Sequence, residues 1–149
     1  MKRTSRLPVH AMQQLAGAAV LGLLAASPSG ALAADTLKIG VIAEVQSIAG
    51  AATPGGAQIA ADEINAKGGV LGKQVELVIE DDQTTNPGIV LAFSKLAAQS
   101  DIVAFLGSIR STQVQAMAPD VIKVGKPVMI GGTNPDLTHS GNPWLFRFR

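Results

Sequence analysis

Residues 103–112 (Val-Ala-Phe-Leu-Gly-Ser-Ile-Arg-Ser-Thr) decide the fold of this 149-residue chain. Residues 103–106 form a short apolar run that starts with a β-branched residue, which is typical of a strand buried on both faces. Gly107 and Ser108 interrupt this run, and an amphipathic helical pattern follows over residues 113–124. A strand that ends in a glycine turn and leads into a helix is where open α/β sheets bind ligands.

Ser111 and Thr112 are the candidate binding residues of this stretch, because they stand at the front of the helix. Hydroxyl groups beside free backbone N–H groups suit an anionic ligand group. Serine and threonine are also common helix caps, so simple capping by Ser111 or Thr112 is the alternative interpretation.

The rest of the chain repeats the alternation of strand and helix. Strands are expected at residues 37–42, 74–79 and 127–130, and a fifth from residue 144. One helix is expected from Gly56 to the Gly68-Gly69 stop, and another after Asn86 as N-cap. Residues 137–143 are expected to be loop. The third helix is predicted to bury Val114, Met117, Ala118, Val121 and Ile122. This order predicts an α/β fold: a doubly wound parallel sheet with helices on both faces.

In such a sheet the carboxyl ends of all strands lie on one edge. That edge collects the small-residue loop 44–53, the turn 108–112 and a second glycine turn, Gly131-Gly132-Thr133. Two hydroxyl-bearing turns on one edge favour ligand binding over two accidental caps. Glu80-Asp81-Asp82 could hold a metal or form a catalytic pair, but no histidine lies nearby, so a solvated strand end is the favoured interpretation.

Composition excludes several classes of function. The chain has no cysteine and no tyrosine, and its 12 basic and 11 acidic residues give a net charge of +1, so nothing indicates nucleic-acid binding. No Gly-x-Gly-x-x-Gly follows the first strand, so nucleotide phosphates have no cradle. The two histidines, His10 and His139, cannot form a triad or a metal cluster. We therefore predict a protein that is not an enzyme, with no cofactor and no metal.

Residues 1–33 are predicted to be a secretory signal peptide. Lys2, Arg3 and Arg6 form a positive start, and residues 15–26 form an apolar core too short to span a bilayer. Ala31-Leu32-Ala33 supplies small residues for cleavage after Ala33. An uncleaved membrane anchor is the alternative. The expected location is the periplasm, with no stable membrane anchor.

Residues 56–77 (Gly-Ala-Gln-Ile-Ala-Ala-Asp-Glu-Ile-Asn-Ala-Lys-Gly-Gly-Val-Leu-Gly-Lys-Gln-Val-Glu-Leu), then Glu80-Asp81-Asp82, resemble the type I periplasmic binding proteins. Within them the chain is most similar to the branched-chain amino-acid (leucine/isoleucine/valine) receptors of ABC importers. Ser111-Thr112-Gln113 and residues 131–138 (Gly-Gly-Thr-Asn-Pro-Asp-Leu-Thr) agree with that family in order and spacing. The resemblance covers residues 35–149.

The resemblance implies a two-lobed protein that closes on its ligand, an amino acid, and delivers it to an ABC permease of the inner membrane. It assigns the ligand's carboxylate and ammonium groups to Ser111 (or Thr112, if the loop shifts by one), the Gly131 carbonyl and Thr133. The family often places an aromatic residue in the loop after the first strand, and residues 44–53 have none. Arg110 is unusual at its place: it could bind a second carboxylate, or simply lie exposed.

The resemblance also implies that residues 34–149 are a first lobe, truncated before the second. We expect such a lobe to leave an apolar sheet face uncovered and to bind ligand weakly or not at all by itself, because closure supplies half of the contacts. Two alternatives stay open: the ligand-binding domain of an amino-acid or amide sensor, and a non-functional gene remnant.

Overall fold

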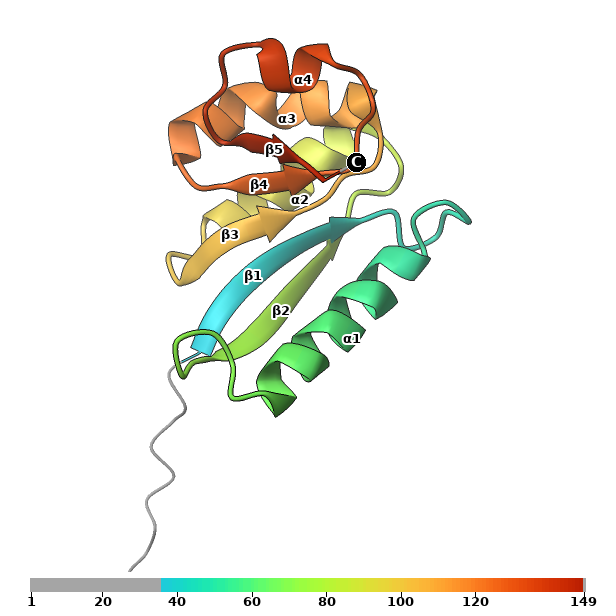
Figure 1. Cartoon of the computed structure of the whole chain (residues 1–149). Helices are drawn as coiled ribbons and strands as arrows, with labels where there is room; N and C mark the ends of the chain where they lie inside the picture. The colour runs from blue at the N-terminus through green and yellow to red at the C-terminus, as the bar shows by residue number, and fades with distance from the viewer. Residues whose placement is uncertain (1–35, 149) are drawn as a thin grey trace, which may run out of the picture. The chain divides into compact units, whose positions relative to one another are not determined.

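Five parallel strands form one sheet in the order β2-β1-β3-β4-β5 in this computed structural model, which describes residues 36–148 (Figure 1). The strands are β1 (Thr36–Ala43), β2 (Gln74–Asp81), β3 (Ile102–Leu106), β4 (Val128–Ile130) and β5 (Leu145–Arg147). The helices are α1 (Ala52–Ala66), α2 (Asn86–Ala97), α3 (Ser111–Val124) and the short α4 (Asp136–His139). This is the predicted doubly wound α/β fold. The predicted signal peptide lies outside the described residues.

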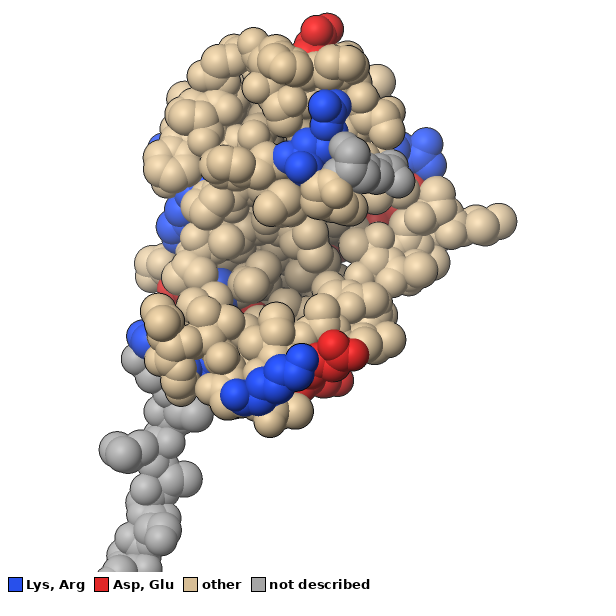
Figure 2. All heavy atoms as spheres, viewed as in Figure 1, with Lys and Arg blue, Asp and Glu red and all other residues tan. Residues whose placement is uncertain are grey.

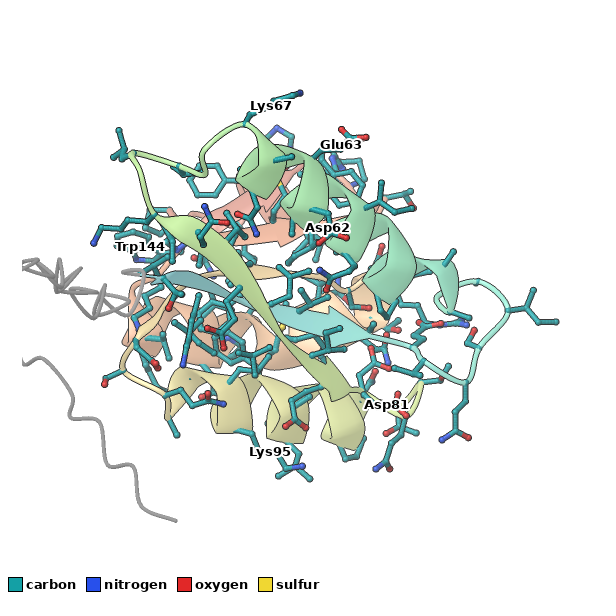
Figure 3. The ribbon with its side chains drawn as sticks, turned by 90° about the horizontal axis from the view of Figure 1, so that it is seen from below. Asp62, Glu63, Lys67, Asp81, Lys95 and Trp144 are labelled. Atoms are coloured by element: carbon teal, nitrogen blue, oxygen red, sulfur yellow. The ribbon has the colours of Figure 1, made fainter. Side chains whose placement is uncertain are left out.

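The hydrophobic core lies between the sheet and helices α2 and α3. Helix α1 covers the opposite face (Figure 3). The core joins residues of the strands with one face of each helix: Ile42, Phe105, Val128, Ile130 and Leu145 with Ile89, Phe93, Leu96, Val114, Met117 and Val121. Phe93 and Phe105 pack ring against ring, with their centroids 5.0 Å apart. The helical spacing of these positions in the sequence is the reason that α2 and α3 form and dock here.

The other face of the sheet is only partly covered. Helix α1 packs on β1 and β2, whereas Met129 of β4 and Phe146 of β5 are each more than two-fifths exposed. A groove of about 260 Å³ runs between Ile64 of α1 and Leu77 and Met129 of the sheet. In Figure 2 most of the surface over β3 and β4 is uncharged. The apolar, uncovered sheet face expected from the sequence is therefore present among residues 36–148.

Local structure differs from the sequence predictions at several points. Helix α2 has Thr85, not Asn86, as its N-cap: Thr85 is extended and its Oγ1 accepts a hydrogen bond from Gly88 N at 2.9 Å. Two adjacent cap-forming residues look alike in a pattern, and only the backbone angle separates them. Helix α1 starts at Ala52 instead of after Gly56, and α4 occupies part of the stretch expected to be loop.

Ile122 is 55% exposed, so its predicted burial in α3 is wrong. Its neighbour Val121 takes the core position, and Ile122 lines a shallow hollow between α3 and the segment around Leu137. Consecutive helical residues point about 100° apart, so both cannot face the same core. Among the described residues, no helix is long and apolar enough to cross a membrane.

Candidate functional site

The turns that follow β3 and β4 meet at the carboxyl edge of the sheet. Gly107 N donates a hydrogen bond to Met129 O at 2.9 Å, and Gly131 N donates to Ser108 O at 3.0 Å. These bonds continue the β3–β4 pairing past the last strand residues. They hold the two glycine turns beside each other, as parallel strand ends predict.

Ser111 connects the two turns. It is the first residue of α3, and its Oγ accepts a hydrogen bond from Asn134 N at 3.0 Å. A Cβ atom on Gly132 would lie 3.3 Å from this Oγ, so a glycine allows the close approach. The N-cap of α3 is Arg110, and no side chain there accepts from the helix N-terminus. Capping of α3 by Ser111 or Thr112, the alternative, is therefore wrong.

The other candidate residues lie along the same edge. Thr112 is exposed in the first turn of α3, and Gly131 is buried directly after β4. Thr133 is exposed, and its carbonyl accepts from Arg147 Nη1 of β5 at 3.1 Å. The edge thus presents hydroxyl groups from two turns, with the N-terminal N–H groups of α3 between them. This set can bind a carboxylate beside an ammonium group, and it needs no proton transfer.

A buried polar cluster beneath this edge escaped the sequence analysis. Glu44, in a stretch expected to be an irregular loop, is 1% exposed, and its Oε1 accepts a hydrogen bond from Arg110 Nε. Arg110 is exposed, as one of its two interpretations expected, and its pairing with Glu44 is an addition that the sequence did not suggest. Ser108 and Gln113 are also buried, with Ser108 Oγ and the Gln113 side-chain amide 2.8 Å apart. Glu44 and Arg110 are 66 residues apart, so no local pattern pairs them.

Asp82 corrects the solvated strand end expected at Glu80-Asp81-Asp82. The whole of Asp82 is buried, and its Oδ1 accepts from Thr84 N at 2.8 Å. Asp81 lies at the end of β2 (Figure 3) and accepts hydrogen bonds from Val45 N and Gln83 N. Burial raises the pKa of the Asp82 carboxyl above its ordinary value, and the negative charge of Glu44 raises it further.

Asp82→Asn is expected to stabilise the fold at pH 8, because it removes a buried charge and keeps an oxygen for Thr84 N. In the native state the pKa of Asp82 is raised, so the folded protein gains stability as the pH falls through this raised pKa. This gain in stability is complete below the ordinary carboxyl pKa of 3.8 and absent above the raised pKa of Asp82. Urea unfolding at several pH values should show the advantage of the variant shrinking in acid. A variant that is less stable by the same amount at every pH would contradict this.

Within residues 36–148 no group of three or more His, Asp or Glu side chains is placed to hold a metal ion. A hollow of about 370 Å³ lies between α3 and residues 136–145, and contains none of the candidate residues. The candidate residues instead lie along the carboxyl edge of the sheet.

Comparisons with known proteins agree with this geometry. Residues 36–149 match the family described as periplasmic binding protein. The leucine-specific-binding protein of Salmonella typhimurium is 28% identical over 141 residues, which cover 91% of this chain and 38% of that protein. This chain therefore spans well under half the length of that curated relative.

Two solved structures share the fold. One is the branched-chain amino acid transporter substrate binding protein of Streptococcus pneumoniae in complex with isoleucine. It is 34% identical, with a TM-score of 0.71 over 76% of this chain and 33% of that one. The other is an ABC transporter substrate-binding protein of Desulfitobacterium hafniense in complex with Leu, 28% identical with a TM-score of 0.70. It is matched over 76% of this chain and 34% of its own length.

Proposed function

The chain belongs to the periplasmic binding protein family, and we propose that it is the substrate-binding component of an ABC importer for branched-chain or related amino acids. The family is one of substrate-binding proteins, not enzymes. The hydroxyl and carbonyl groups at the carboxyl edge of the sheet fit ligand binding without a catalytic step. Its solved relatives are named for complexes with isoleucine and with leucine. The observation that carries the proposal is the joining of the two turns through Ser111 Oγ and Asn134 N.

The ligand's α-carboxylate binds at the start of α3 in this proposal. Ser111 Oγ accepts from Asn134 N, so its own O–H remains able to donate to a carboxylate. The positive end of the α3 dipole adds to the attraction. Thr112 is the alternative donor, and its exposure leaves it accessible.

The ligand's α-ammonium binds at the second turn, to the Gly131 carbonyl and to Thr133. Carbonyl and hydroxyl oxygens accept from an ammonium group, and neither needs to change its protonation state. Arg147 holds the Thr133 backbone through its carbonyl and so supports the geometry of this turn. The whole assignment of Ser111, Thr112, Gly131 and Thr133 is a binding site without a catalytic group.

Capture by closure completes the proposal. We assign residues 34–149 to one lobe, which supplies one wall of the site, and residues 1–33 to an export signal that is cleaved after Ala33. The ligand is collected in the periplasm and passed to an ABC permease of the inner membrane. The chain matches about one third of each solved relative, which supports a single lobe.

Addition of leucine, isoleucine or valine is expected to raise the thermal unfolding midpoint of the purified chain, because a ligand of the native state stabilises it. Ser111→Ala and Thr133→Ala should each weaken binding about tenfold or more, since a hydrogen bond to a charged group contributes about 1.5–3 kcal/mol. Ser94→Ala, an exposed serine of α2, is the control and should change nothing. A midpoint that no amino acid moves, in this chain and also in a chain with a second lobe restored, would refute the proposal. A loss with Thr112→Ala but not with Ser111→Ala would move the carboxylate to Thr112.

A further inference from the structure

The Arg110 side chain is fixed at one end and open at the other. Its Nε donates to the buried Glu44 carboxylate, while the Arg110 side chain is 44% exposed. Within residues 36–148 its two Nη groups have no hydrogen-bond acceptor from the protein. A guanidinium held in this way presents a planar set of N–H donors in a defined position.

The carboxylate that anchors Arg110 is itself held firmly. With the Gln113 amide nitrogen facing Ser108, that nitrogen also lies 3.2 Å from Glu44 Oε1 and donates to it. The Gln113 oxygen then accepts from Thr85 N at 3.0 Å, which ties the anchor to the start of α2. Glu44 is therefore held by two side chains at the start of α3, Arg110 and Gln113, and Gln113 is itself tied to the start of α2.

Stability alone does not account for this ion pair. A buried carboxylate is unfavourable unless all its oxygens are well hydrogen-bonded, and Glu44 Oε2 has no donor in the described part of the chain. The pair leaves one buried oxygen of Glu44 without a donor. Its clear structural effect is to hold the guanidinium in one place.

That place is the candidate site. Arg110 is the N-cap of α3, and its guanidinium pairs with Glu44, the residue directly after β1, so the guanidinium lies at the carboxyl edge of the sheet that carries the two turns. The loop after β1 carries no aromatic side chain against which an aliphatic ligand could pack. An aliphatic ligand side chain next to Arg110 would displace water from N–H groups without replacing its hydrogen bonds.

We propose that Arg110 is a specificity-determining residue that hydrogen-bonds a side-chain oxygen of the ligand, so that the preferred amino acids end in a carboxylate or a carboxamide. This inference rests on the proposed function and narrows the ligand class of the same site. A carboxylate can accept two parallel N–H bonds from the guanidinium, and a carboxamide oxygen accepts one or two. Glu44 is the positioning residue for this contact.

The test is calorimetric titration of the purified chain with glutamate, aspartate, glutamine, asparagine and leucine. We expect at least one ligand with a side-chain oxygen to bind about tenfold more tightly than leucine. Arg110→Gln should remove that preference while leaving leucine affinity within about twofold. Arg110→Lys should retain part of it for the carboxylates only, because lysine keeps the charge and loses the planar donor set. Lys123→Gln, an exposed cation of α3, is the matched control and should leave every affinity unchanged.

Arg110→Gln leaves Glu44 without its partner, so this variant can fail to fold. The double variant Glu44→Gln/Arg110→Gln removes both charges and keeps the inference testable, since it too should lose the preference. Leucine binding as tight as that of the four other amino acids would overturn the inference and leave the proposed function intact. A uniform loss for all five ligands in the variants would overturn it as well. Binding of none of the five, by this chain and by a chain with a second lobe restored, would overturn both.

Discussion

Gly107→Ala is expected to be among the most damaging single-methyl changes in the described chain, with a loss of at least about 3 kcal/mol of unfolding free energy. A Cβ atom on Gly107 would lie 2.0 Å from Ile42 O, a backbone atom of the neighbouring strand β1. Strand β1 is paired on both sides, so it cannot move away. The φ angle of Gly107 is +113°, a value that residues with a Cβ atom rarely adopt. Backbone strain of this kind adds about 1–3 kcal/mol to the expected loss of unfolding free energy.

The measurement for Gly107→Ala is urea unfolding followed by circular dichroism, with Gly55→Ala as the control. Gly55 lies in α1, and a Cβ there would have no neighbour within 4 Å. Alanine favours the helix over glycine, so Gly55→Ala should raise stability by about 0.5–1 kcal/mol. An unchanged midpoint for Gly107→Ala would show that the turn after β3 is not packed against β1 as described.

Phe105→Ala is the second large effect, and we expect it to cost about 3–5 kcal/mol. Phe105 is 2% exposed and packs against Phe93 of α2, with the two rings tilted at 57° to each other. Its removal leaves a cavity between β3 and α2, and the walls of a packed core relax only partly. Because small domains are stable by about 5–15 kcal/mol, this variant should unfold well below the wild-type urea midpoint.

Phe146→Ala is the matched control, since it deletes the same side chain from the uncovered face of the sheet. Phe146 is 47% exposed, so much of its surface is already in water and its loss should cost less than about 2 kcal/mol. Equal losses for the two variants would show that the face carrying Phe146 is covered in solution. Concentration dependence of the Phe146→Ala midpoint would then identify self-association as the cover.

One part of the candidate site could be predicted from the sequence, and the other part could not. Ser111, Gly131 and Thr133 could be placed on one edge from the sequence, because strand ends in a parallel sheet share an edge. For Arg110 the sequence left two interpretations open, contact with a second carboxylate or simple exposure. Its pairing with Glu44, the burial of Asp82 and the position of Gln113 could not be predicted, because each depends on segments that are distant in the chain.

The sequence by itself determined the order of the strands and of helices α1 to α3 and most of the residues that form the core, since apolar spacing reports which side of an element avoids water. The sequence also determined that the two glycine turns lie on the same edge of the sheet. Only the tertiary structure decided which polar groups are buried, and that Arg110 has a fixed position. The physical reason is that the energy of a buried charge depends on partners brought together by the fold, whereas the periodicity of apolar residues is local.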